Sequence, residues 1–357
     1  MKKHNFNPGP SILPASVLQE AAQSVIDYQG KGLSILEISH RGSEFTAIIE
    51  EAVALTKELL GLSDDHHVLF TTGGASTQFY MMAMNLLNKG DIASYTDTGT
   101  WANKAIKEAK PYGDIKVVAS SKEANYNFIP KNWTPVPGSR FMHLTSNNTI
   151  FGTQIQEWPD LEIPIVSDMS SDIFSKPIPV EKFGMIYAGA QKNIGPSGVT
   201  MVIIRKDMVR TDLDHYLPPM LDYKTYIAEN SLYNTPPVFP IYVSMLTLRW
   251  IKENGGLNGI QAINEKKAAL LYNEIDANPF FKGTVAKEDR SLMNVCFVCE
   301  NPDHEAEFEA DAKKAGCVNF KGHRSVGGFR ASIYNAMPIE SVQVLVDTMK
   351  EFGKRKG

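Results

Sequence analysis

Short, continuously apolar runs alternate with helical patterns along the N-terminal part of the chain. One helical pattern consists of apolar residues three or four positions apart, namely Phe45, Ile48, Ile49, Ala52, Val53, Leu59 and Leu60. Gly61 follows it as a predicted C-cap. Further helices are predicted at residues 79–87 and 101–109, and strands at residues 68–70, 92–95, 115–119, 141–145, 163–167, 185–188 and 199–205.

Strands of this kind are typical of a sheet whose two faces are both buried, because neither face shows polar positions. Their alternation with helices predicts an α/β fold. We therefore expect a mainly parallel, seven-stranded sheet with helices on both faces.

The pattern changes after Pro236-Pro237. Helices are predicted at residues 241–252 and 260–275, followed by strands at residues 292–299 and 329–334. We place a boundary at Gly255-Gly256, which predicts a large domain over residues 16–255 and a smaller α+β domain over residues 256–357. The loop-like residues 1–15 are expected to pack against the small domain.

Charge and cysteine content narrow the class of protein. The 357-residue chain has 36 basic and 40 acidic residues and a net charge of −4, which argues against nucleic acid or an anionic membrane as a partner. The N-terminus lacks the apolar region of a signal peptide, and no apolar run is as long as a membrane span. We expect a cytoplasmic protein.

Three cysteines, Cys296, Cys299 and Cys317, are too few for a disulfide scaffold and fit a reducing compartment. Cys296 and Cys299 form a lone C-x-x-C within a predicted strand. Because no second ligand pair lies nearby in the sequence, we interpret them as small buried apolar residues rather than metal ligands. No metal site is predicted.

Polar residues follow several of the predicted strands, at the end where α/β proteins bind ligands. Gly73-Gly74-Ala75-Ser76-Thr77 leads from a strand into a helix, and the exposed N–H groups of such a turn favour a phosphate. A glycine-rich turn with Ser76 as N-cap is the alternative. The segment does not match the glycine patterns typical of ATP or dinucleotide binding.

Four more strand ends carry polar or aromatic groups. Trp101 is able to stack on a planar ring or simply to pack, and Ser146-Asn147-Asn148-Thr149 offers hydroxyl and amide groups. Asp168 ends one apolar run, and Gln191-Lys192 follows another. A lysine amine forms a Schiff base with an aldehyde, and a carboxylate holds a pyridinium nitrogen. Asp168 and Lys192 together therefore suggest pyridoxal phosphate (PLP), although a solvated surface lysine is the simpler reading of Lys192 alone.

Longer motifs make the chain resemble the class V (fold-type I) PLP-dependent aminotransferases, and among them the phosphoserine aminotransferase family. The resemblance extends over essentially the whole chain. The matching stretches are Phe6-Asn7-Pro8-Gly9-Pro10, Ser39-His40-Arg41, Thr72-Gly73-Gly74-Ala75-Ser76, Ser146-Asn147-Asn148-Thr149-Ile150-Phe151-Gly152-Thr153, Ser167-Asp168-Met169-Ser170-Ser171, Tyr187-Ala188-Gly189-Ala190-Gln191-Lys192-Asn193, Tyr233-Asn234-Thr235-Pro236-Pro237 and Gly322-His323-Arg324-Ser325-Val326-Gly327-Gly328-Phe329-Arg330-Ala331-Ser332.

The resemblance implies a role for each matching residue. Lys192 is expected to form the Schiff base and move the substrate's α-proton, and Asp168 to pair with the pyridine nitrogen. Trp101 is expected to stack on the ring, and Thr149 to bond near its phenolic oxygen. These four residues would hold and activate the ring of PLP.

The resemblance also assigns the cofactor's phosphate. Ala75, Ser76 and Gln191 are expected to bind it. Asn234 and Thr235 are expected to reach the phosphate of a neighbouring subunit, which implies a homodimer with shared active sites. Many family members carry an arginine after the glycines, where this chain has Ala75-Ser76. The distal anion of the substrate must therefore be held by other residues.

Arginine suits the two anionic groups of the expected substrate, because its planar fork pairs bidentately with oxyanions. We expect Arg330 to bind the α-carboxylate. His40, Arg41, His323 and Arg324 are expected to surround the distal phosphate, although His40 and Arg41 also read as a capping cluster before a helix.

The implied reaction is a ping-pong transamination of 3-phosphonooxypyruvate with L-glutamate, which gives O-phospho-L-serine and 2-oxoglutarate in L-serine biosynthesis. Some relatives also use 4-phosphooxy-L-threonine, in pyridoxine biosynthesis. The alternatives are another class V enzyme, such as an alanine–glyoxylate aminotransferase or a cysteine desulfurase, and a non-catalytic PLP-binding protein. Cys317 and the strand-borne cysteines are poor candidates for the mobile nucleophile of a desulfurase.

Overall fold

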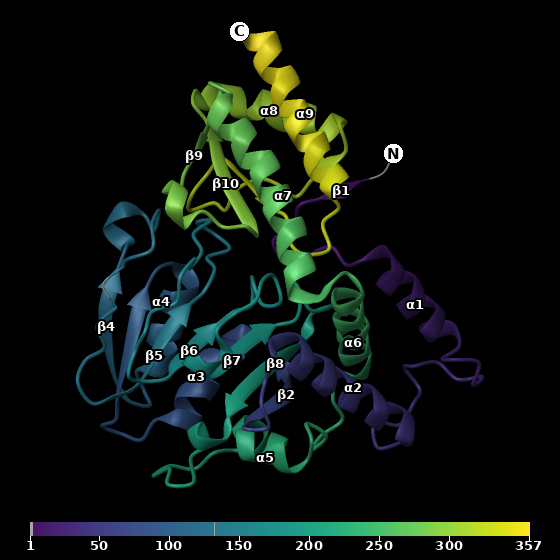
Figure 1. Cartoon of the computed structure of the whole chain (residues 1–357), viewed down its shortest axis with the longest axis vertical. Coiled ribbons are helices and arrows are strands. Elements are labelled where there is room, and N and C mark those ends of the chain that lie inside the picture. Colours follow the sequence, from purple (N-terminus) through teal and green to yellow (C-terminus); the bar gives the residue numbers. More distant parts are fainter. Residues whose placement is uncertain (1–2, 132) are drawn as a thin grey trace.

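A seven-stranded sheet forms the centre of the molecule in the computed structural model, which describes residues 3–131 and 133–357. The strand order is β2-β8-β7-β6-β5-β3-β4 (Figure 1). The strands are β2 (His66–Gly73), β3 (Ile92–Asp97), β4 (Asp114–Ser120), β5 (Ser139–Thr145), β6 (Ile165–Asp168), β7 (Phe183–Gly189) and β8 (Gly198–Arg205). All seven predicted strands are confirmed.

The sheet is mainly parallel, as predicted, but β8 runs antiparallel to both of its neighbours, β7 and β2. The connection from β7 to β8 contains only residues 190–197. A connection this short returns the chain antiparallel, since a parallel return needs a long crossover. Lys192 lies in this connection, and its position therefore depends on the reversal.

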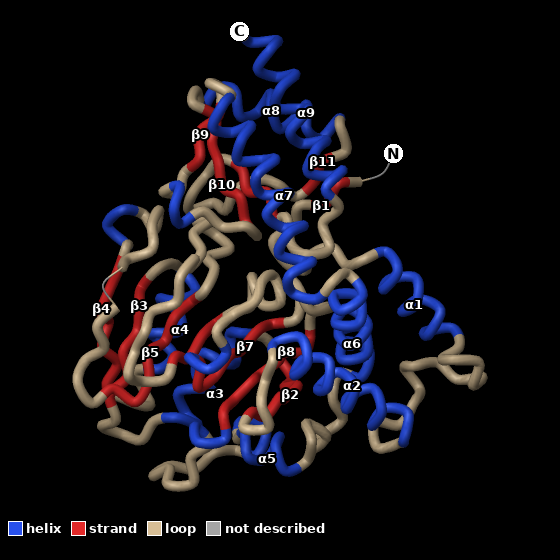
Figure 2. Tube along the Cα trace, in the orientation of Figure 1, coloured by secondary structure: helices blue, strands red, loops and turns tan. Residues whose placement is uncertain are grey.

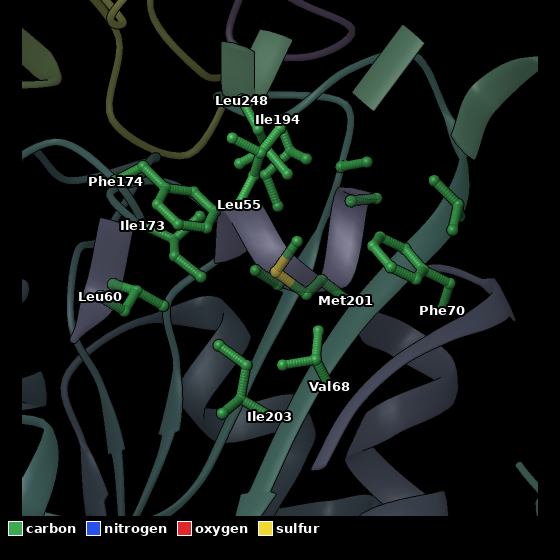
Figure 3. Close-up of a cluster of buried hydrophobic side chains, with 14 of the residues drawn as sticks. Leu55, Leu60, Val68, Phe70, Ile173, Phe174, Ile194, Met201, Ile203 and Leu248 are labelled. Atoms are coloured by element: carbon green, nitrogen blue, oxygen red, sulfur yellow. The ribbon is translucent and has the colours of Figure 1, made fainter. Parts of the chain in front are cut away.

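One face of the sheet is covered by α2 (Ser43–Leu60) and α6 (Val238–Glu253). Figure 3 shows Leu55 and Leu60 of α2 and Leu248 of α6 against Val68 and Met201 of the sheet. The helix α2 ends at Gly61, whose φ of 66° is left-handed, so the predicted C-cap is confirmed. Burial of this apolar layer stabilises the sheet from one side.

The opposite face is covered by α3 (Ala75–Leu86) and α4 (Thr100–Ala109). Their apolar residues pack with Tyr95, Phe141 and Tyr187 of the sheet. The short helix α5 (Tyr223–Ala228) packs against the edge strand β2. The predicted two-sided cover is therefore confirmed, and it explains why the central strands lack polar alternation.

A smaller region stands above the sheet in Figure 2. It contains the antiparallel strands β9 (Phe281–Gly283), β10 (Asn294–Cys299) and β12 (Phe329–Ser332), with α7 (Gly256–Ala277), α8 (Glu305–Lys314) and α9 (Ile339–Lys356). Aromatic residues fill its core, among them Phe281, Phe297, Phe308 and Phe352. The division of the chain at residue 255 stays a prediction.

The N-terminal segment packs against this smaller region. β1 (His4–Asn5) pairs in parallel with β11 (Cys317–Val318), and Phe6 is fully buried in the aromatic core. The chain then passes to α1 (Ala15–Ile26), at the outer side of α6 (Figure 1). Residues 8–11 lie in the connection between β1 and α1, and they pass close to Lys192.

A helix that is long and apolar enough to cross a membrane is not found among residues 3–131 and 133–357.

Candidate active site

The strands β2, β3, β5, β6 and β7 run in the same direction, so their carboxyl ends lie at one edge of the sheet. β8 is the only strand of the sheet, as described, that runs the other way. The five predicted strand-end segments therefore share that edge, as expected for an α/β ligand site.

Asp168 is the last residue of β6 and is only 6% exposed. Its Oδ1 accepts hydrogen bonds from the N–H of Ser170 at 2.9 Å and from its hydroxyl at 2.6 Å. Burial raises the pKa of Asp168, against the lowering effect of Ser170 and of the Lys192 charge. The second oxygen, Oδ2, accepts no hydrogen bond from the described residues and is available to an incoming N–H.

Ser146 holds the backbone of Asp168 from the neighbouring strand. Its N–H and its hydroxyl each donate to the Asp168 carbonyl at 3.0 Å. The same hydroxyl bonds the buried carboxyl of Asp172, whose pKa is raised by burial to about 6. Asp168 is thus fixed through both its side chain and its main chain, which suits a group that must hold one orientation.

Lys192 lies in the turn between β7 and β8, and its Nζ is 2.6 Å from the hydroxyl of Thr149. Burial lowers the pKa of this amine to about 8. Asp168 and Asp172 oppose that shift, and the positive charge of Arg330 adds to it. A lysine that loses its proton near physiological pH is suited to nucleophilic and proton-transfer chemistry.

Arg330 comes from β12 of the smaller region and is 7% exposed. Its Nη1 donates to the main-chain oxygen of Thr149 at 3.2 Å, and its Nε has no partner among the described residues. Burial lowers the pKa of Arg330, but a guanidinium in a protein keeps its charge. A cation with an unused donor therefore lies next to the Lys192 amine, where a carboxylate would bind.

Trp101 is in the first turn of α4 and is half-buried. It packs against Tyr126, Ile150 and Phe151, and the Lys104 ammonium lies 4.6 Å from its ring centroid. The buried indole N–H has no hydrogen-bond partner within residues 3–131 and 133–357. The ring is therefore held in place by packing, which suits stacking on a planar ligand.

The predicted phosphate cradle lies at the start of α3. Gly73 has a φ of 111°, and a Cβ there would lie 2.6 Å from the Thr77 hydroxyl, so this sharp turn requires glycine. Ala75 and Ser76 are the first residues of the helix, where N–H groups have no intrahelical partner. Gln191 lies beside Lys192 and is half-buried.

These donors and acceptors fit PLP. Asp168 has a free carboxylate oxygen, Lys192 supplies an amine of lowered pKa, and the start of α3 supplies N–H groups for an anion. When bound, the cofactor supplies an aldehyde for a Schiff base and a protonated ring that withdraws electrons.

His323 and Arg324 precede Arg330 in a loop that is closed at its base by a hydrogen bond between Gly322 and Gly328. Burial lowers the pKa of His323, and the charges of Arg330 and Arg324 add to this effect. The side chain of His323 bonds the Ser325 hydroxyl at 2.7 Å. The structure therefore brings these three predicted substrate residues into one positively charged neighbourhood.

Two other predicted pairs are not brought to Lys192 by any hydrogen bond within the described chain. Arg41 is exposed, and the buried Nε2 of His40 has no partner within residues 3–131 and 133–357. The side chain of Asn234 donates only to the carbonyl of Thr235 within the described chain. His40 and Asn234 are half-buried, whereas Arg41 and Thr235 are exposed.

Sequence reasoning missed the residues that support the site. Ser170 holds Asp168, Ser146 and Asp172 fix its backbone, and Ser11 donates its N–H to the Gln191 carbonyl at 2.8 Å. Ser146 and Ser170 lie inside the motifs that carry the family resemblance. No local pattern distinguishes Ser11, because its partner is far along the chain.

Comparison with known proteins identifies the family. The family described as Aminotransferase class-V matches residues 3–345. The chain belongs to the class-V aminotransferases. The phosphoserine aminotransferase of Flavobacterium psychrophilum is 54% identical over 352 residues, 98% of this chain and 99% of the relative.

Solved structures of phosphoserine aminotransferases share the fold of this chain. The phosphoserine aminotransferase of Bacillus circulans subsp. alkalophilus superposes with a TM-score of 0.96 at 49% identity, and the match covers 100% of this chain and 99% of the relative. The PLP-bound phosphoserine aminotransferase of Trichomonas vaginalis gives a TM-score of 0.93 at 37% identity, covering 98% and 100%. The predicted fold class, the transaminase class and the PLP cofactor are confirmed.

Proposed function

We propose that this class-V aminotransferase transfers the amino group of L-glutamate to 3-phosphonooxypyruvate, which gives 2-oxoglutarate and O-phospho-L-serine in serine biosynthesis. The observation that carries the proposal is the meeting of Lys192, Thr149 and Arg330. It places a reactive amine beside a buried cation that suits a substrate carboxylate. The names of relatives about half identical in sequence support the same reaction.

Lys192 is the residue that moves the proton. With a pKa near 8, its Nζ is partly neutral at physiological pH and accepts the α-proton of the bound amino acid. Thr149 holds the amine in place until then. Asp168, with its free oxygen, would hold the cofactor's ring nitrogen, and the bound cofactor would supply an electron-withdrawing ring.

Arg330 binds the α-carboxylate that both substrates share. His323 and Arg324, in the loop before it, bind the distal anion, which is a phosphate in one substrate and a carboxylate in the other. Their positive neighbourhood takes the place of the arginine that is missing after Gly73-Gly74. We also assign His40 and Arg41 to the distal anion.

The enzyme is proposed to act as a homodimer with shared active sites. Asn234 and Thr235 make no hydrogen bond to the site of their own chain, as far as the structure describes it, so a neighbour's cofactor phosphate is their proposed ligand. Large apolar side chains are exposed on α1 and the loop after it, namely Leu18, Ile26, Leu33 and Leu36. A second copy would remove them from water. Three buried thiols without disulfides agree with a cytoplasmic location.

The direct test is a coupled assay on purified protein with L-glutamate and 3-phosphonooxypyruvate, in which 2-oxoglutarate is measured. We expect turnover, and we expect Lys192→Ala to abolish it. Parallel reactions with glyoxylate and alanine, and with 4-phosphooxy-L-threonine, measure the alternative class V activity and the untested pyridoxine-pathway substrate. Turnover with alanine and glyoxylate but not with the phosphorylated substrate would overturn the proposal.

A further inference from the structure

Tyr334 lies two residues beyond β12 and is fully buried, with 0% of its surface exposed. Its hydroxyl donates to the Pro8 carbonyl at 2.8 Å and accepts a hydrogen bond from the Asn294 amide at 3.1 Å. Burial raises the pKa of Tyr334 to about 12. The phenol therefore joins the N-terminal segment at Pro8 to the Asn294 side chain on β10.

The segment from Pro8 to Ser11 links Tyr334 to Lys192. Ser11 donates its N–H to the Gln191 carbonyl at 2.8 Å, and its hydroxyl bonds the Lys192 carbonyl. A Cβ placed on Gly9 would lie 3.6 Å from Cγ of Lys192, so the segment runs directly along that side chain. Lys192 is therefore enclosed between its own turn and the N-terminal segment.

Hydrogen bonds also fix the backbone on both sides of the Tyr334 side chain. The fully buried side-chain amine of Lys267 on α7 donates to the carbonyls of Ile333 and Tyr334 at 3.0 and 2.6 Å. The main-chain N–H of Asn335 donates to Oδ1 of Asn193, the residue after Lys192. The backbone that carries Tyr334 is thus fixed both to α7 and to the lysine turn.

We propose that Tyr334 is a positioning residue for the amino-transfer reaction, which holds the segment Pro8–Ser11 against Lys192 so that the amine is kept in place for proton transfer. The inference rests on the proposed function for its reaction. Its structural part concerns the amine itself, which is measurable without any substrate. The Tyr334 hydroxyl bonds Pro8 and Asn294 and neither the amine nor the Asp168 carboxylate, so its effect on Lys192 passes through Pro8 and the segment that follows it.

The test compares Tyr334→Phe with Tyr272→Phe. Tyr272 is a matched control, because it is also buried in the smaller region and its hydroxyl also donates to a main-chain carbonyl, that of Ser291 at 2.9 Å. The full chain, freed of cofactor, is treated with an amine-acylating reagent over a range of pH, and acylation of Lys192 is followed by peptide mass spectrometry. Asp168, Asp172 and Arg330 are the charged groups that act on this amine, and they are unchanged in both variants.

We expect Tyr334→Phe to shift the half-point of Lys192 acylation to higher pH, because the released segment lets water reach an amine whose pKa is lowered by burial. In the cofactor-loaded enzyme, kcat should fall about tenfold, the size of one lost hydrogen bond, while KM for glutamate changes less than about twofold. Tyr272→Phe should leave all three quantities unchanged. Equal behaviour of the two variants would overturn the inference.

Ser11→Ala provides a second test if Tyr334→Phe does not fold. It removes the hydroxyl at the other end of the segment, which bonds the Lys192 carbonyl. We expect kcat to fall in this variant as well. An unchanged kcat would argue against a role of the segment Pro8–Ser11 in holding Lys192. If wild-type protein lacks transaminase activity but the acylation shift is present, the proposed reaction is wrong and the positioning of Lys192 stands.

Discussion

The Nζ of Lys192 lies 2.6 Å from the hydroxyl of Thr149, although 43 residues separate them in sequence. Thr149 follows β5 and Lys192 follows β7, and β6 with Asp168 lies between those two strands. The Thr149 hydroxyl accepts a hydrogen bond from the amine, and the carboxylates of Asp168 and Asp172 favour its charged form, against a burial that favours the neutral form.

Removal of the Thr149 hydroxyl should make Lys192 easier to deprotonate. In Thr149→Val, a change that keeps the side chain's shape, we expect the pKa of Lys192 to fall below its present value of about 8. Turnover should fall about tenfold, because the amine is no longer held in position. The pH dependence of Lys192 acylation and the steady-state rates measure the two effects. Thr247→Val, which removes another buried hydroxyl on α6, should change neither.

Neutralising Asp168 should affect chemistry more than folding. Asp168→Asn keeps an oxygen that is able to accept from Ser170, but it removes the negative charge that would hold a protonated ring nitrogen. We expect kcat to fall by roughly 100-fold or more, a loss typical of a removed electrostatic partner. The melting temperature should stay close to that of the wild type. Full activity in Asp168→Asn would refute the assigned role.

Arg330 should act mainly on substrate binding. Arg330→Lys keeps the charge but loses the planar fork, so we expect KM for glutamate to rise about tenfold with a smaller change in kcat. Arg290→Lys is the control, because Arg290 pairs bidentately with Asp276 in the same region without taking part in the site. An equal effect of both changes on KM would argue against carboxylate binding by Arg330.

Lys267 should make stability depend on pH. Burial lowers the pKa of Lys267 from 10.5 to about 7, so between those values the unfolded chain binds a proton that the folded chain does not. Stability therefore rises with pH across that window, relative to a chain without this lysine. Urea unfolding of Lys267→Met should lack this rise. It should also show a loss of about 2 kcal/mol at pH 9, since the carbonyls of Ile333 and Tyr334 lose their donor.

The neighbouring Lys266 provides the control for that experiment. It is exposed on the same helix, so Lys266→Met should reproduce the wild-type pH dependence of stability. A pH profile for Lys267→Met that is parallel to the wild-type profile would show that Lys267 keeps its proton in both states.

The sequence by itself determined the local structure and the chemical groups. Helix α2 with Gly61 after it, the seven strands of the sheet, and the polar groups at the strand ends were all predicted from spacing and turn residues. These features depend on contacts within a few residues or on alternation along one element. The pair Asp168 and Lys192 was found in this way, because each directly follows or ends an apolar strand.

Only the tertiary structure decided how those groups meet. β8 turned out to be antiparallel because of its short connection to β7, and this reversal places Lys192 in a tight turn. Arg330 reaches Thr149 across 181 residues, and Tyr334 reaches Pro8 across 326. Contacts between residues so far apart depend on how whole elements pack, and no periodicity within either segment encodes its distant partner. The sequence therefore determined the chemistry of the site, and the packing of the smaller region against the sheet determined its geometry.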